Sequence, residues 1–147
     1  MSGHPRRHHQ ERGAVAVEFA LVVPILVVLF FGIVNIGIVL AQQLSLSNSA
    51  RQAARFAVVD VEGRACGDIE AEARNAAQTI GMAPADPAYA LTGATGTCAR
   101  PCADSTATTD LTVTLTYRSN FVVPIPIPGV PSGLDIAGEG VFRCEYK

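Results

Sequence analysis

The chain has 147 residues, 49% of them hydrophobic, and a formal net charge of −2. This length is typical of about one domain. After residue 41, acidic side chains outnumber basic ones, which disfavours nucleic-acid binding because a duplex-binding surface needs a positive field. All histidines precede residue 13 (His4, His8, His9), so removal of a leader would exclude a Ser-His-Asp triad and any histidine metal ligand.

One long apolar segment dominates the first third of the chain. Between residues 14 and 41 the only formally charged side chain is Glu18. Residues 19–40 would span about 33 Å as a helix, which is enough to cross a bilayer. Because Arg6, Arg7 and Arg12 precede the segment, the positive-inside rule predicts a cytoplasmic N-terminus and an extracytoplasmic remainder. Pro24 predicts a local bend in this helix.

A cleaved signal peptide is the alternative interpretation of the same segment. The residues that end in Ala41 resemble a signal-peptidase site, and cleavage there would leave Gln42 as the first residue. Secretory hydrophobic regions usually have about 7–15 residues, however. The longer segment found here favours an intact membrane anchor.

A carboxylate at the start of a lipid-facing helix requires an explanation. Glu18 could be an interfacial side chain that reaches the headgroups, since burying its charge in lipid is costly. It is, however, the fifth residue after Gly13, which ends the basic leader. This arrangement resembles the type IV prepilin signal, which implies cleavage by a membrane aspartyl prepilin peptidase between Gly13 and Ala14. The new ammonium of Ala14 in a neighbouring subunit would then pair with Glu18. Many type IV pilins carry Phe where this chain has Ala14.

The resemblance becomes more specific along the helix. The run from Arg12 through Val17-Glu18-Phe19-Ala20 to Pro24, together with the distal run Ala50-Arg51-Gln52-Ala53-Ala54-Arg55, resembles the TadE-like family. These proteins are the pseudopilins of the Tad (tight adherence, Flp pilus) machinery. The resemblance implies that Glu18, Phe19 and Pro24 serve helix register and assembly, and that Arg51 and Arg55 are family positions.

The helical pattern continues beyond the membrane segment. It predicts one helix over residues 14–59, with Leu40, Leu44 and Ser47 on its packing face. The small side chains Ala50, Ala53, Ala54 and Ala57 permit close packing, either against the chain's own outer domain or against another subunit. A second helix is predicted over residues 68–80, capped by Gly67 or Asp68.

Two strands follow the helices. Residues 110–117 alternate between apolar side chains and threonine, and residues 136–146 form a second candidate strand. Four prolines in residues 122–131 predict an extended connector between the strands. A partner-binding tip is the alternative role of this segment.

The cysteines all follow the membrane segment (Cys66, Cys98, Cys102, Cys144). An even number of cysteines in a small extracytoplasmic domain favours two disulfides over a zinc site. Three connectivities are possible, and we favour Cys66–Cys98 with Cys102–Cys144.

These patterns predict an α+β protein with a long pilin-like helix and a small domain containing one further helix and a hairpin or small sheet. The predicted segments are a leader (1–13), a transmembrane helix (14–41), an amphipathic extension (42–62) and a disulfide-stapled outer domain (63–147). The resemblance implies a minor pilin-like subunit of the bacterial inner membrane that supports adherence or secretion. Its expected partners are a prepilin peptidase, other pilins, inner-membrane platform proteins and the lipid bilayer.

Other functional classes are less favoured. A major pilin is disfavoured because the outer domain is large. A membrane-anchored binding protein unrelated to pili is the main alternative, and a secreted enzyme is the least favoured. No catalytic residue, cofactor, metal or small-molecule substrate is expected.

Overall fold

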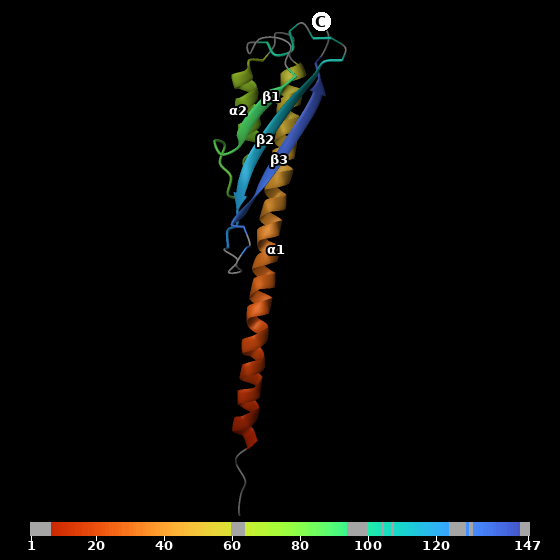
Figure 1. The fold of residues 1–147 in the computed structure, drawn as a ribbon. Helices are drawn as coiled ribbons and strands as arrows, with labels where there is room; N and C mark the ends of the chain where they lie inside the picture. The colour runs from red at the N-terminus through yellow and green to blue at the C-terminus, as the bar shows by residue number, and fades with distance from the viewer. Residues whose placement is uncertain are drawn as a thin grey trace, which may run out of the picture.

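The fold is a long helix with a small domain packed on its C-terminal half (Figure 1). The structure is a computed structural model that describes residues 7–59, 64–93, 100–103, 105–106, 108–123, 129 and 131–144. Its elements in chain order are α1 (Arg7–Val59), α2 (Cys66–Ala76), β1 (Ala88–Thr92), β2 (Asp110–Asn120) and β3 (Gly133–Arg143). The predicted α+β class is confirmed.

Helix α1 has 53 residues and would reach about 80 Å at the standard rise. It continues without interruption through Pro24. The predicted start at residue 14 is wrong, because α1 begins at Arg7 and passes through Gly13. A single glycine lowers helix stability by about 1 kcal/mol, which is too little to end a long helix.

The three strands form one antiparallel sheet in the order β1-β2-β3. The two predicted strands are present, although β2 extends to Asn120, while β3 begins at Gly133 and ends at Arg143. Strand β1 was not predicted, because its five residues include two alanines and carry only a weak strand signal. The predicted proline-rich connector lies largely outside the described residues.

The sheet rests directly on the backbone of α1 through two glycines of β3. A Cβ atom added to Gly138 would lie 2.3 Å from the carbonyl carbon of Leu46, and one added to Gly140 would lie 2.3 Å from the carbonyl oxygen of Ala50. Only residues without a side chain permit this approach. The two glycines therefore set the distance between helix and sheet.

The alanine-rich face of α1 packs against the chain's own outer domain. Ala50, Ala53, Ala54 and Ala57 are buried in the core with apolar residues of α2, β2 and β3. This outcome supports the first of the two alternatives for these alanines. The predicted packing face was wrong in its lower part, because Leu40 and Leu44 are exposed and Leu46 is fully buried.

Helix α2 is shifted from its predicted bounds of residues 68–80. It begins at Cys66 after Ala65, whose carbonyl accepts the Asp68 and Ile69 N–H groups, and no side chain caps it. The predicted cap by Gly67 or Asp68 is therefore wrong. The helix ends at Ala76, and beyond it the carbonyls of Ala77 and Ile80 accept hydrogen bonds from side chains of α1.

A disulfide ties the end of the last strand to the rest of the domain. Cys102 and Cys144 are bonded, with 5.6 Å between their Cα atoms, which confirms one predicted pair. Cys66 is also disulfide-bonded. Its predicted partner Cys98 lies outside the described residues, so that pairing stays a prediction.

Candidate functional site: the long helix

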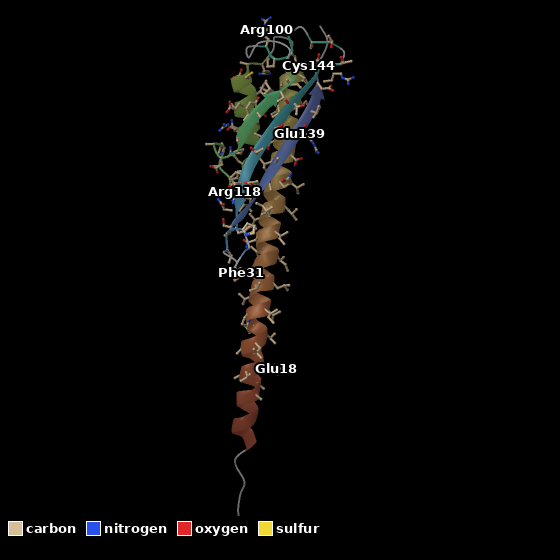
Figure 2. The ribbon with its side chains drawn as sticks, in the orientation of Figure 1. Glu18, Phe31, Arg100, Arg118, Glu139 and Cys144 are labelled. Carbon is tan, nitrogen blue, oxygen red and sulfur yellow. A yellow bond between two sulfur atoms is a disulfide. The ribbon has the colours of Figure 1, made fainter. Side chains whose placement is uncertain are left out.

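The lower half of α1, which carries the residues of the predicted cleavage and register site, is bare. Gly13, Ala14, Glu18 and Phe19 are all exposed, and Figure 2 shows Glu18 on the uncovered part of the helix, well away from the sheet. The structure therefore leaves Glu18 without a partner among the described residues. A partner for this carboxylate has to come from outside the described part of the chain.

This bare part has the length and composition of a membrane span. One helix, Gly13–Val59, is long and apolar enough to cross a bilayer, and only 6% of its apolar window is buried. The core helix of a soluble protein is mostly buried, in contrast to this segment. A single apolar N-terminal helix of this kind fits a single-pass membrane protein.

Gly13 itself offers open access. Apart from its chain neighbours and the adjacent helix backbone, no described atom lies within 4 Å of the place where its Cβ would be. The glycine lies inside α1, so a protease that binds an extended backbone would first have to unwind the helix there. Glycine reduces the cost of unwinding, because it is a poor helix former.

Above the bare part, the side chain of Asn35 forms hydrogen bonds between α1 and the outer domain. The side-chain Nδ2 donates to the Val123 carbonyl at 2.9 Å, and the Val123 N–H donates to Asn35 Oδ1 at 3.2 Å. Asn35 is 2% exposed, so its amide would carry a desolvation penalty without these bonds. This pair is defined here as the Asn35–Val123 clasp.

Further polar side chains along α1 bind main-chain carbonyls of the domain. Gln42 Nε2 donates to the Ile80 carbonyl at 2.9 Å, and Ser45 Oγ donates to that of Ala77 at 3.2 Å. On the other side, Gln43 Nε2 donates to the Ala137 carbonyl of β3 at 2.6 Å. These bonds fix the rotation of α1 relative to the sheet, because each donor must face its own carbonyl.

The distal family positions Arg51 and Arg55 lie on the uncovered face of α1. They line an open groove of about 750 Å³ beside Phe56, Arg64 and other residues near the top of the helix. Arg64 stacks on the Phe56 ring, with 4.2 Å from its guanidinium carbon to the ring centroid. Within the part of the chain that the structure describes, Arg51 and Arg55 form no ion pair. Their charges are available to a partner.

The described residues contain no candidate metal-binding site. No group of three or more His, Cys, Asp or Glu side chains there could hold a metal ion. Cys102 and Cys144 are engaged with each other, so they are not available as thiolate ligands.

Sequence reasoning missed Asn35 and Gln42, the two buried amides of α1. Their signal was present, since both are polar residues at a seven-residue spacing in or beside the apolar run. Leu46, Ala53 and Ala57 follow Gln42 on the buried face at steps of four, seven and four residues. The polar residues of an apolar helix therefore indicated its packed face better than the leucines did.

Comparison with known proteins agrees with the sequence resemblance. The family model described as TadE-like protein matches residues 13–55. No curated protein and no solved structure matches the chain. The matched residues begin at Gly13 and end at Arg55, so they include Glu18, Pro24 and both exposed arginines. Residues 13–55 therefore form a TadE-like segment, and they relate this chain to the proteins of the Tad pilus.

Proposed function

We propose that this chain is a minor pilin-like subunit, a pseudopilin, of Tad/Flp pilus assembly. A prepilin peptidase would cut it after Gly13, and the mature subunit would assemble through α1. The observation that carries this proposal is the bare, apolar half of α1 within a TadE-like segment. The TadE-like family is structural rather than catalytic, which agrees with a role as a subunit and not as an enzyme.

The uncovered face of α1 supports assembly through the helix. Large apolar side chains remain exposed above the Asn35–Val123 clasp, including Ile36, Leu40 and Leu44, which is 64% exposed. These residues lie at four-residue steps and continue the bare face of the lower half. Exposed contiguous apolar surface of this kind is typical of an interaction site. In this proposal, helices of neighbouring subunits cover it.

The carboxylate of Glu18 would set the register between these helices. Cleavage after Gly13 creates an ammonium at Ala14, and this group in one subunit would pair with Glu18 of its neighbour. Removing a carboxylate from water is costly unless an opposite charge compensates it. A subunit placed in the wrong register would leave both charges unpaired, so the pair favours one arrangement.

The proposal also includes the location and the partners of the subunit. The subunit would cross the bacterial inner membrane once, with its N-terminus in the cytoplasm and its disulfide-bonded domain outside. Its partners would be the prepilin peptidase, other pilins and the inner-membrane Tad platform, and its assembly would support adherence or secretion. The exposed Arg51 and Arg55 would face these partners.

A Glu18→Ala variant in the native host tests the assembly role. We expect it to insert into the membrane normally and to be lost from the sheared filament fraction, because its register pair is absent. Glu139→Ala is the matched control, since Glu139 is an exposed carboxylate of the outer domain. Recovery of the Glu18→Ala variant in filaments at the level of this control would contradict the proposal. It would favour a membrane-anchored binding protein unrelated to pili.

A further inference from the structure

The lower tip of the sheet, defined here as residues 121–123, is fastened to α1 next to its bare half. The Asn35–Val123 clasp uses both the donor and the acceptor of one side-chain amide, and it joins residues 88 positions apart. It also satisfies the N–H and the carbonyl of Val123. The main-chain N–H and carbonyl of Val123 are therefore hydrogen-bonded within the protein and do not require water.

The composition of the tip is apolar. The sequence contains no charged side chain from Phe121 to Ser132. The Phe121 N–H donates to the Ser132 carbonyl at 2.8 Å, and Val122 is 65% exposed. The nearest charged pair, Arg118 with Asp135 at 3.1 Å, lies farther up the sheet and is exposed. The charged side chains of the sheet therefore lie above the tip, and the tip itself carries none.

The position of the clasp along α1 matches the thickness of a bilayer. From Ala14 to Asn35 the helix rises about 32 Å, against about 30 Å for a hydrocarbon core. With Ala14 at the cytoplasmic boundary, Asn35 would lie at the outer one. Figure 2 shows Phe31, four residues earlier, on α1 below the lower end of the sheet.

We propose that the tip rests in the outer surface of the bilayer, with Val122 at the boundary between headgroups and acyl chains. Non-helical backbone is tolerated at this depth only where its polar groups are satisfied, and the clasp meets this condition at Val123. The membrane boundary then lies at Asn35 and not at residue 41. The outer domain is then held at the membrane both by α1 and by the tip. The proposal requires that α1 crosses the bilayer, but it does not depend on pilus assembly.

Tryptophan fluorescence tests this placement, because the chain contains no tryptophan. Val122→Trp is compared with Val141→Trp, an exposed position near the other end of β3. Each full-length variant is reconstituted at low density in phosphatidylcholine vesicles, with or without bromine at positions 6 and 7 of one acyl chain. We expect blue-shifted emission and roughly twofold or greater quenching by brominated lipid for Val122→Trp only.

Two outcomes would overturn the proposal. Emission and quenching of the Val122→Trp variant at the level of Val141→Trp would mean that the tip lies in water. A blue shift without quenching by brominated lipid would mean that protein covers the tip, such as a second copy of the chain. Because these vesicles contain no other pilus component, failure here leaves the Glu18→Ala assembly test unaffected.

A second variant tests the clasp. Adding Asn35→Ala to Val122→Trp should reduce the quenching by at least about half, because an Ala side chain cannot bind the Val123 main chain. Asn48→Ala is the matched control, since Asn48 is an exposed asparagine of the same helix. Unchanged quenching in the Asn35→Ala background would overturn the role of the clasp in placing the tip.

Discussion

The two halves of α1 differ in the size of their side chains and in what covers them. In the lower half, large residues such as Phe19 and Leu21 are exposed, with no domain beside them (Figure 1). In the upper half, the buried positions include four alanines, and two glycines of β3 approach the helix backbone at Leu46 and Ala50. Large side chains suit a helix that meets lipid or other helices, whereas small ones allow the backbone of a sheet to approach. One continuous helix therefore carries two different surfaces.

The two largest expected effects concern the covered half of α1 and the domain on it, and they are of similar size. Gly138→Ala or Gly140→Ala should lower the free energy of unfolding of the outer domain by about 3 kcal/mol, because the new Cβ would collide with the backbone of α1. Chemical denaturation of the detergent-solubilised chain, followed by tyrosine fluorescence, measures this loss. Gly67→Ala is the control, since open space surrounds Gly67 in α2 and alanine favours helix there. Equal stability of all three variants would contradict the close helix–sheet contact.

The disulfide gives the next effect, again confined to the covering domain. Replacing Cys102 and Cys144 together by serine should lower the free energy of unfolding by about 2–4 kcal/mol, because the bond closes a loop across 42 positions. The same denaturation experiment measures it under non-reducing conditions. Membrane insertion should stay unchanged, since it depends on the bare half of α1. A loss below about 0.5 kcal/mol would show that the bond contributes little to the domain.

At the boundary between the halves, Asn35→Ala should lower the free energy of unfolding by about 1–3 kcal/mol, because it removes both hydrogen bonds to the half-buried Val123 main chain. The control Asn48→Ala should change stability by less than about 0.5 kcal/mol, since Asn48 is exposed. Hydrogen exchange of the Val123 amide measures the clasp directly and should accelerate only in the first variant. Equal exchange in both variants would contradict the clasp.

The smallest effect concerns Tyr89 on the edge strand β1. Burial, with a smaller contribution from Glu70, raises the pKa of Tyr89 to about 12. The folded state disfavours the tyrosinate, so this contribution to stability is complete below pH 10 and is lost as the pH rises through 12. Absorbance titration at alkaline pH should show a late tyrosine component that Tyr89→Phe removes. Retention of that component would assign it to another tyrosine.

Much of the fold could be predicted because the strongest patterns are local. The uninterrupted apolar run indicated α1, and alternation of apolar residues with threonine indicated β2. The even cysteine count indicated disulfides, one of which is confirmed between Cys102 and Cys144. Strand β1 was missed because its stability comes from pairing with β2 and not from its own residues.

The packed face of α1 could not be predicted well, because the apolar run has large side chains on every side. Leu40 and Leu44 looked like core residues, yet they are exposed, since the sheet approaches from the side of Leu46. The periodicity of apolar residues identifies the buried face of a helix only where polar and apolar residues lie on different sides of it. The close contact at Gly138 and Gly140 likewise required the tertiary structure. The leader motif with Gly13 and Glu18 is the reverse case, since it has a sequence signal, while the residues that the structure describes supply no partner for Glu18.

The mature N-terminus is the most direct test of the account, which holds that the bare half of α1 is an assembly element made by cleavage. Intact-mass spectrometry of the chain purified from its native host should give the mass of a protein that begins at Ala14. The ammonium there would be the partner of Glu18 in a neighbouring subunit. A protein that begins at Met1 would contradict processing after Gly13. One that begins at Gln42 would show that the apolar segment is a signal peptide and would contradict the membrane anchor as well.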